Sequence, residues 1–517
     1  MSDSRRVQIR NLLANWIGHG ANMVVLLLLS PFVVHTLGKV EYGIWSLLMV
    51  LTGYMGVLDL GIRASTGRYV ILYVGRGDRQ RVDETIRTGL GFFVVVGVVV
   101  QVAAALIGWV FPSAFADVPP AYYGTVKLLL PLLAVNVWIS AFASVIGSVL
   151  PAYDRFDLRC GLDLTVLAFR TVGTIWALKA GSGLVGLSMV VVACNVLALA
   201  GNWFLSRRVH PGLRVWPLVF SRERLRELFT YGFYALIGTI SMKIIGQTDL
   251  VVTGALISVA AVTVYSVGAM LIYYSSTLIE QINQTFFPPV QRAEARGEMG
   301  AVRWLFFRQV RLAMIFGLPM NVGFMVFGTA FIRLWMLKGD FTESNVCKAG
   351  LVMAILASSK LLILFESGAD ALLAAVGHIR FSAIMNVANA LLNLGLSVFF
   401  VVVLDWGLAG VAAGTLVARL IVGTFIVPWY ACRKVGLNWR RYLADIGGRE
   451  CICIAAFGAV CAAIRWAVPR PSWMVFWMQV VLALVCYVPI AWAVLVPGDD
   501  RRRMLGWLLR RGTEGRR

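Results

Sequence analysis

The chain has 517 residues, of which 59% are hydrophobic and only 14% are charged, and its mean hydropathy is +0.79. A soluble protein of this length carries about a quarter charged residues because its surface meets water, so this composition excludes a soluble globular protein. The formal net charge of +21 would suit nucleic acid, but the basic residues lie at the ends of apolar segments, and we expect no nucleic-acid partner.

Fourteen apolar segments follow one another along the chain, each long enough to cross a hydrocarbon core of roughly 30 Å. Because the backbone finds no water at that depth, each segment is predicted to be an α-helix. The first has no small-residue cleavage site, so we interpret it as a retained helix rather than a signal peptide. In chain order the segments cover residues 11–36, 42–72, 86–111, 122–150, 160–180, 183–206, 228–256, 259–288, 304–336, 346–376, 378–404, 407–432, 450–468 and 472–496.

Basic residues are divided unevenly between the connections. With the N-terminus inside, the cytoplasmic segments hold 32 Lys and Arg, whereas the opposite connections hold 7. This asymmetry predicts that both termini are cytoplasmic. The basic tail from Arg501 to Arg511 is predicted to lie along the inner leaflet.

The two halves of the chain share a pattern at an offset of roughly 224 residues. The sequence GLVGL opens the sixth segment and GLAGV opens the twelfth, and an Arg-Phe pair follows both the fourth and the tenth. We predict an all-α polytopic fold with two six-helix bundles related by pseudo-two-fold symmetry, plus two C-terminal helices. The predicted boundaries are 1–220 for the first lobe, 221–435 for the second lobe, and 436–517 for the two additional helices with the basic tail.

Four cations lie near the middle of predicted segments. An ionisable residue there costs about 2.5–3.5 kcal/mol on insertion scales, so it usually faces a cavity or a partner. The four could line a lumen that binds phosphate, for which Arg offers a matching fork, or each could pair with a local carboxylate and tie helices together. They are Arg170, Lys243, Lys360 and Arg419.

Three carboxylates are candidates for ion coupling. Glu366 and Asp370 are four residues apart, on one face of the tenth segment. Two carboxylates in a low dielectric repel each other, which favours a bound proton or cation; the alternatives are a salt bridge to another helix or contact with cytoplasmic water. For Asp249 two interpretations stay open, a functional role and bracing of the second lobe. Asp59 and Arg63, also four apart, are interpreted as a structural pair.

Other polar residues suggest structure rather than chemistry. Asn386, Asn389 and Asn393 follow one face of the eleventh segment and could bind sugar hydroxyls, but we favour hydrogen bonds between helices. The four histidines form no ligand cluster, the eight cysteines are scattered, and no nucleophile has an adjacent base, so we expect neither a metal site nor a catalytic site.

Several motifs resemble a known family. The sequence LGKVEYGIW at 37–45, followed by LDLGI at 58–62, resembles the first two spans of O-antigen-type polysaccharide flippases. Arg68, Tyr69 and the loop GRGD at 75–78 continue the pattern, and Asp249, Gly254 and Tyr265 resemble the start of the second lobe in these proteins. Such flippases belong to the multidrug/oligosaccharidyl-lipid/polysaccharide exporter superfamily, and the resemblance covers roughly residues 8–435.

The resemblance implies two lobes that move a lipid-linked oligosaccharide, of the undecaprenyl diphosphate class, to the outer leaflet by alternating access for surface polysaccharide synthesis. It also implies a bacterial inner-membrane transporter without a cofactor, among membrane lipids and next to polymerase and export machinery. The paired carboxylates suggest that a proton or sodium gradient drives the transport. An ion-coupled multidrug or metabolite exporter of the same superfamily is one alternative. A membrane polysaccharide polymerase or ligase is another, although the outer connections are short for its acceptor.

Overall fold

The computed structural model describes residues 2–216, 218, 221–376, 378–470, 472–496, 498 and 501. Within these residues the chain consists of helices and connections, with one isolated β-bridge between Lys338 and Phe341. The prediction of an all-α fold is therefore confirmed. Contacts divide the chain into two compact units, Met1–Thr263 and Val264–Arg517, which are described separately.

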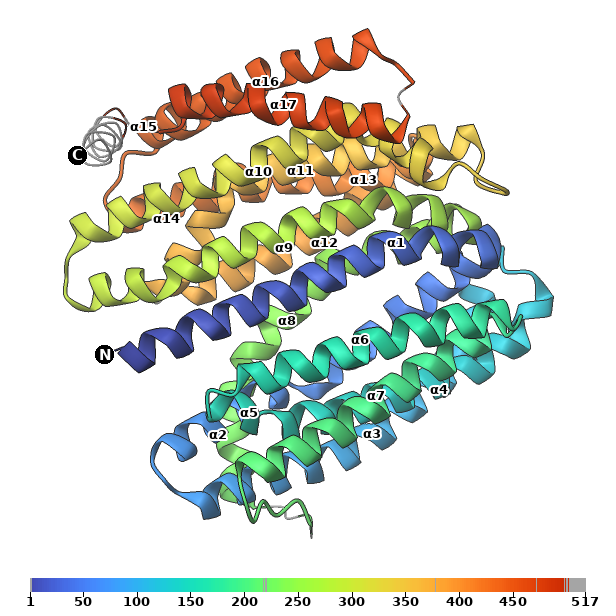
Figure 1. Ribbon diagram of the computed structural model, residues 1–517, viewed down its shortest axis with the longest axis vertical. Helices are drawn as coiled ribbons and strands as arrows, with labels where there is room; N and C mark the ends of the chain where they lie inside the picture. The colour runs from blue at the N-terminus through green and yellow to red at the C-terminus, as the bar shows by residue number, and fades with distance from the viewer. Residues whose placement is uncertain are drawn as a thin grey trace, which may run out of the picture. The chain divides into compact units, whose positions relative to one another are not determined.

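Unit 1 consists mainly of long helices that run side by side (Figure 1). α4 packs against α3 and α7, and α6 packs against α7 and α1. The helices are α1 (Ser2–Met55), α2 (Ile62–Gly75), α3 (Arg79–Ala114), α4 (Tyr123–Gly147), the short α5 (Val149–Ala152), α6 (Phe156–Lys179), α7 (Gly183–Val209) and α8 (Arg222–Leu256); α9 (Val259–Ala295) begins in this unit.

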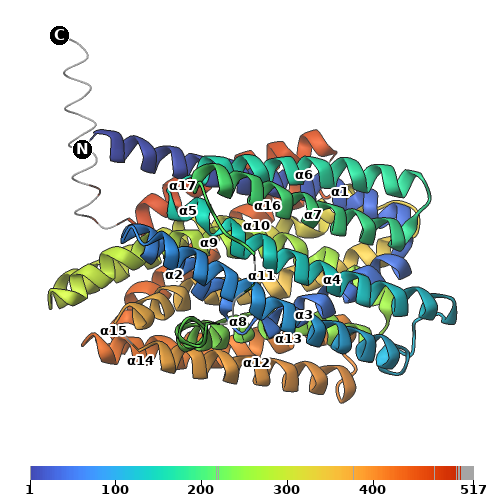
Figure 2. The same cartoon turned by 90° about the horizontal axis from the view of Figure 1, so that it is seen from below.

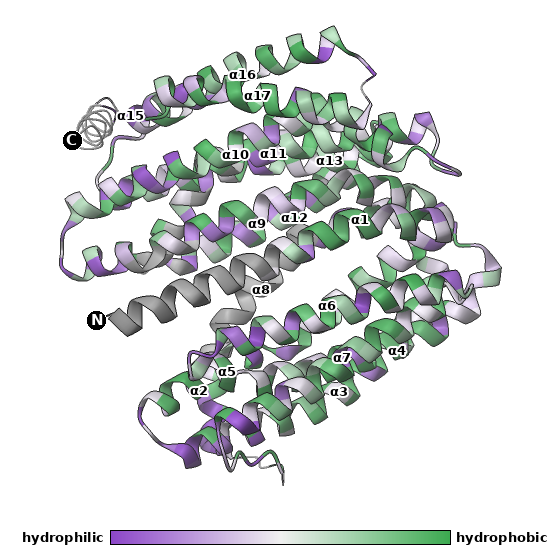
Figure 3. Cartoon of the chain, viewed as in Figure 1, coloured by the Kyte–Doolittle hydropathy of each residue, from purple (hydrophilic) through white to green (hydrophobic). Residues whose placement is uncertain are grey.

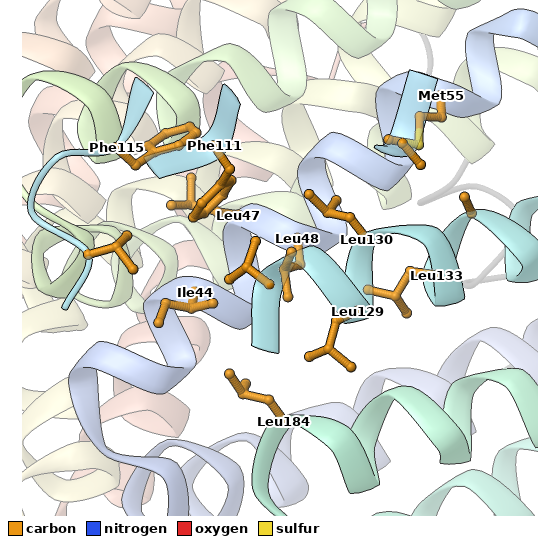
Figure 4. Packing of buried hydrophobic residues seen from close by; sticks show 14 of the residues in the cluster. Ile44, Leu47, Leu48, Met55, Phe111, Phe115, Leu129, Leu130, Leu133 and Leu184 are labelled. Atoms are coloured by element: carbon orange, nitrogen blue, oxygen red, sulfur yellow. The ribbon is translucent and has the colours of Figure 1, made fainter. Parts of the chain in front are cut away.

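The largest apolar cluster of unit 1 lies where the second half of α1 meets α3 and α4. Leu47 and Leu48 of α1 and Leu129, Leu130 and Leu133 of α4 are completely buried, and Figure 4 shows these side chains packed together. Lipid tails are as apolar as leucine, so close packing rather than exclusion of water holds such helices together.

The second predicted segment is not one helix. α1 bends at Gly38 and ends at Met55, a 3-10 turn covers Gly56–Asp59, and α2 begins only after Gly61. Leu60 and Gly61 both have positive φ, 50° and 73°, which interrupts the helical hydrogen bonding. The prediction of a continuous helix over 42–72 is therefore wrong, because an apolar run does not reveal a break made by two residues.

Gly61 fixes this break, and Gly61→Ala is expected to lower the unfolding temperature of the purified protein. A left-handed conformation costs an L-residue about 1–2 kcal/mol, and an added Cβ would collide with the carbonyl oxygen of Gly232 on α8. Gly67→Ala is the matched control, because Gly67 lies within α2 with open space around its Cβ. If Gly61→Ala unfolds at the wild-type temperature or above, the glycine does not fix the break.

Unit 2 is built on two close helix pairs, α10 with α11 and α12 with α13. The last two helices pack on α10: Tyr487 of α17 donates a hydrogen bond to the Ile315 carbonyl at 3.1 Å, and its ring lies against Phe457 of α16. The helices are α10 (Met299–Met336), α11 (Glu343–Ala375), α12 (Ile379–Val402), α13 (Gly407–Arg419), α14 (Val427–Lys434), α15 (Trp439–Tyr442), α16 (Gly448–Ala467) and α17 (Trp473–Val494); π-helical segments cover Leu420–Ile426 and Leu443–Gly447.

The division by packing differs from the predicted lobes. α8 packs against α1, α2 and α3, so unit 1 continues to Thr263 instead of ending near residue 220. The predicted boundaries describe an internal repeat, and the repeat stays a prediction.

Twelve helices in the described part of the chain are long and apolar enough to cross a membrane. The predicted number of fourteen is therefore approximate. The first two predicted segments share the bent α1, and the seventh falls on α8, where most side chains between 231 and 246 lie outside the described residues. Seen from below, the long helices within each unit again run side by side (Figure 2). In Figure 3, polar residues gather near many of the connections, and apolar residues predominate along the helices. Exposed examples are Val98, Leu106, Trp176, Leu391 and Val485.

Candidate functional site

A buried ion pair joins two helices of unit 2. Arg419, the last residue of α13, lies near the middle of the span Gly407–Lys434. Its Nη1 donates a hydrogen bond to Oε2 of Glu366 on α11 at 2.8 Å. The two side chains are only 12% and 4% exposed. The pair therefore joins a residue predicted to bind substrate with one predicted to couple transport to an ion.

The helix changes its winding next to the ion pair. The π-helical segment Leu420–Ile426 begins directly after Arg419. Within it, a Cβ on Gly423 would overlap Oε2 of Glu366 and would lie 2.8 Å from Cδ of Arg419. The glycine leaves the space in which the two charged groups meet. Single π-helical turns inside α-helices are frequent at functional sites, and this one sets the position of Arg419 relative to α11.

A second carboxylate extends the cluster toward the turn between α11 and α12. Asp370 lies one helical turn beyond Glu366, and Ser382 of α12 donates a hydrogen bond from its Oγ to Oδ1 of Asp370. Glu366 and Arg419 both act electrostatically on the Asp370 carboxyl. Two carboxylates, one guanidinium and one hydroxyl from three helices thus form a continuous polar cluster, which we call the α11 cluster.

The α11 cluster carries one more negative than positive group when both acids are ionised. In a low-dielectric environment an uncompensated charge is costly, so the arrangement favours a bound proton or a small cation that balances it. Among the described residues, no group of three or more His, Cys, Asp and Glu side chains could hold a metal ion. The arrangement suits the exchange of protons or monovalent cations around Arg419, and the coupling of transport to such an ion stays a prediction.

The other predicted cations divide between the units. Arg170 lies in unit 1 as an exposed residue of α6, and Lys360 lies in unit 2 as a half-buried residue of α11. Lys243 lies on α8, but its side chain is outside the described residues. Arg419 follows the alternative in which a cation pairs with a local carboxylate. A lumen shared by all four stays a prediction.

Asp249 is buried on α8 in unit 1, with 7% of its surface exposed. Its neighbour Thr248 forms a hydrogen bond with the Tyr54 hydroxyl of α1 at 3.0 Å. This contact ties α8 to α1 just before the helix break. Its position is consistent with bracing, while a functional role for Asp249 stays a prediction.

Asp59 and Arg63 form the expected pair at the break, with Nε of Arg63 3.4 Å from Oδ2 of Asp59. Asp59 also accepts a hydrogen bond from the Gly61 amide, and Arg63 donates to the Val137 carbonyl and the Ser140 hydroxyl of α4. The pair thus bridges the break between α1 and α2 and attaches it to α4, as expected of a structural pair. A cavity of about 10 Å³ beside it has room for about one water molecule.

The prediction of hydrogen bonds between helices is confirmed for Asn393, whereas for Asn386 and Asn389 it stays a prediction. The Asn393 Nδ2 donates to Oγ1 of Thr415 on α13 at 3.2 Å, and its Oδ1 accepts from Ser397 at 3.0 Å. Ser397 also donates to the Val411 carbonyl of α13. Small residues allow this approach, because a Cβ on Gly414 would overlap the Ser397 hydroxyl.

Comparison of the sequence with known protein families identifies the family of this chain. The family described as polysaccharide biosynthesis protein matches residues 34–339, more than half of the chain. The chain belongs to this family. The resemblance to the polysaccharide flippases of the multidrug/oligosaccharidyl-lipid/polysaccharide superfamily is thereby confirmed.

Relatives and solved structures agree with this family. The chain is 20% identical to the uncharacterized membrane protein EpsK of Bacillus subtilis strain 168, over 95% of this chain and 97% of that protein. It is 18% identical to a putative O-antigen transporter of Shigella flexneri, over 82% and 98% of the two chains. Its fold is similar to the lipid II flippase MurJ in an inward closed conformation, with a TM-score of 0.68, 13% identity, and coverage of 94% and 98%. The protein is thus a multi-pass membrane protein of a polysaccharide transporter family.

Sequence reasoning missed Ser382 of the α11 cluster and Gly423 beside it. A lone serine near the start of a helix, such as Ser382, carries no specific signal. Gly423 had a signal, since glycines recur at 410, 414 and 423 in one segment and indicate close helix approach. The partner of that approach, Glu366, could not be read from the sequence.

Proposed function

We propose that the protein translocates a polyprenyl-diphosphate-linked oligosaccharide, of the undecaprenyl diphosphate class, across the bacterial inner membrane by alternating access. The observation that carries the proposal is the family match over residues 34–339. The names of an O-antigen transporter and of a lipid II flippase among the similar proteins support this substrate class. A mid-span guanidinium supports it as well, because a diphosphate that enters a low-dielectric lumen needs cations to replace its water.

The α11 cluster suggests how transport is coupled to an ion. Arg419 donates a charge-assisted hydrogen bond to Glu366, so this part of its guanidinium is engaged. Protonation of the carboxylates, or binding of sodium between them, weakens this bond and frees the guanidinium for phosphate oxygens. Release of the ion restores the pair and displaces the phosphate. A proton or sodium gradient would then drive a cycle in which Arg419 alternates between carboxylate and substrate, with Arg170, Lys243 and Lys360 as further cationic contacts and Asp249 as a second candidate for ion coupling.

The orientation follows from the basic connections. We propose that both termini lie in the cytoplasm and that the protein works beside a polysaccharide polymerase and export machinery, which would consume the translocated oligosaccharide. One relative is named as a putative O-antigen transporter, so we propose a transporter rather than a polymerase or ligase. A multidrug or metabolite exporter of the same superfamily is the second candidate, because transporters of multidrug type share the fold.

Neutral substitutions of the cations test the proposal. In a strain that lacks its own flippase, at least two of Arg170→Gln, Lys243→Gln, Lys360→Gln and the double change Glu366→Gln/Arg419→Gln are expected to reduce surface polysaccharide at unchanged membrane abundance. The loss of one charge-assisted hydrogen bond, about 1.5–3 kcal/mol, corresponds to about tenfold or more in the affinity of the site. Arg170→Lys should retain more activity than Arg170→Gln.

Lys338→Gln is the matched control, because Lys338 is an exposed cation in the connection between α10 and α11. It is expected to export polysaccharide normally. Normal export by all the neutral variants at normal abundance would show that no cationic lumen binds a diphosphate. Export of drugs, but not of oligosaccharide, by the wild-type protein would favour the multidrug alternative.

A further inference from the structure

A cavity lies in unit 2 beside the connection that leads into the last two helices. Its volume is about 220 Å³, which gives room for a group several water molecules in size. α10 contributes two of its lining residues, and the others come from α15, the connection before it and the π-helical segment after it. The lining residues are Phe307, Arg311, Leu437, Asn438, Arg441, Tyr442 and Asp445.

Packed aromatic rings form part of the cavity lining. The ring of Tyr442 is only 1% exposed and stacks on Phe306, with 5.3 Å between the centroids and 15° between the planes. The ring of Trp439 also stacks on Tyr442, with 6.0 Å between the centroids and 25° between the planes. The ring centroid of Phe307 lies 5.9 Å from that of Tyr442. Asn438 caps α15 by accepting hydrogen bonds from the amides of Arg440 and Arg441, which holds the connection in place.

The rim of the cavity is basic. The Arg311 guanidinium lies 5.9 Å from the ring centroid of Phe307, on the same helix. Arg441 also lines the cavity, with its Nε 3.8 Å from Oδ2 of Asp445, and the Arg441 side chain is 84% exposed. The lining thus holds two guanidiniums and one carboxylate, and it carries a net positive charge. Further basic residues in the same stretches of the chain are Arg303, Arg308, Arg433 and Lys434.

The position of the cavity along α10 corresponds to the edge of the hydrocarbon core. A helix needs about 20 residues to cross that core, so a count back from the end of α10 at Met336 reaches about residue 317. Arg311 and Phe307 lie just beyond, at the level of lipid headgroups. Trp304, 56% exposed with Arg308 over its ring at 4.9 Å, lies one further turn along, as is typical of a membrane interface.

We propose that this cavity binds the phosphate-bearing headgroup of an anionic phospholipid. Two guanidiniums match the phosphate oxygens. The apolar wall of Phe307, Leu437 and Tyr442 accommodates the glycerol and the first methylenes of the chains, which a free phosphate lacks. The surrounding basic residues favour a lipid with net negative charge over one that carries an ammonium group. On the predicted orientation, this lipid belongs to the cytoplasmic leaflet.

The bound lipid has a structural consequence for unit 2. It would contact α10 from one side and the connection before α16 from the other, and would thereby hold this connection against the bundle. The site is independent of the α11 cluster, so the proposal does not depend on the transported substrate.

The experiment measures lipid binding to the purified full-length chain in detergent. Native mass spectrometry counts bound phosphatidylglycerol and phosphatidylethanolamine at matched concentrations, and thermal unfolding is followed with and without each lipid. The double variant Arg311→Gln/Arg441→Gln removes both guanidiniums, and Leu437→Trp fills the cavity while it keeps them. Arg440→Gln is the matched control, because Arg440 has the same charge and lies on the same short helix but does not line the cavity.

The wild-type protein is expected to prefer phosphatidylglycerol and to unfold at a higher temperature in its presence. The double variant and Leu437→Trp should each weaken this binding by about tenfold or more, whereas Arg440→Gln should stay within about twofold. Undiminished binding by both cavity variants, or equal binding of phosphatidylethanolamine by the wild type, would overturn the proposal. Stabilisation by inorganic phosphate at the concentration effective for the lipid would instead identify a soluble-phosphate site and would also overturn it.

Discussion

Glu366→Gln is expected to destabilise the protein by about 3 kcal/mol, because it leaves the Arg419 guanidinium buried without its carboxylate. Loss of one partner of a buried ion pair typically costs about 3–5 kcal/mol, whereas replacement of both partners is often nearly neutral. The 12% and 4% exposure of the two side chains places this pair in the buried class. The unfolding temperature of the purified variant should therefore fall by about 3 °C, since a chain of this length loses about 1 °C per kcal/mol.

The double change Glu366→Gln/Arg419→Gln is expected to recover most of the lost stability, since it removes both charges together. Glu280→Gln is the matched control, because Glu280 is an exposed carboxylate on α9 and should leave the unfolding temperature unchanged. A double variant that unfolds as early as Glu366→Gln would show that the two side chains do not act as a pair. A stable double variant that no longer transports would separate a functional role of the pair from its structural role.

Most of the architecture could be predicted from the sequence, because only helices and closed barrels satisfy the backbone hydrogen bonds within a membrane. Runs of about 20 apolar residues must be helical, and the basic connections alternate with them, so the all-α polytopic fold followed directly. The break at Leu60 and Gly61 was missed since hydropathy averages over a window and registers no change of φ at two residues. A glycine between Leu60 and Ile62 was the only local signal, and glycines are common throughout this chain.

The candidate site could be predicted only in part. The spacing of Glu366 and Asp370 placed both carboxylates on one face of a helix, and the position of Arg419 placed a cation at mid-span. That Arg419 meets Glu366, 53 positions earlier in the chain, depends on the packing of α11 against α13 and on the π-helical segment that follows Arg419. Neither is encoded in a local pattern, because a π-helical turn depends on which neighbour satisfies the displaced carbonyls.

Asp370→Asn is expected to abolish the dependence of transport on an ion gradient while it leaves the ion pair of Glu366 and Arg419 intact. Asparagine has nearly the same shape and still accepts a hydrogen bond from Ser382, but it neither binds a proton near neutral pH nor carries the charge that attracts sodium. The excess negative group of the α11 cluster then disappears, so protonation or sodium binding no longer competes with Arg419 for Glu366. The measurement is flipping of a lipid-linked oligosaccharide in proteoliposomes, with a proton gradient, a sodium gradient or neither imposed.

Ser382→Ala distinguishes the effect of the Asp370 charge from that of its hydrogen bond, because it removes the hydrogen bond and keeps the charge. This control variant should still respond to the gradient, with a response shifted along the pH or sodium axis, since the hydrogen bond stabilises the ionised carboxylate and its loss favours the bound proton or cation. The Asp370→Asn variant should instead flip at one rate under all three conditions, at unchanged abundance. If Asp370→Asn keeps the wild-type response to both gradients, Asp370 is a structural anchor for α12 and the coupling ion is bound elsewhere.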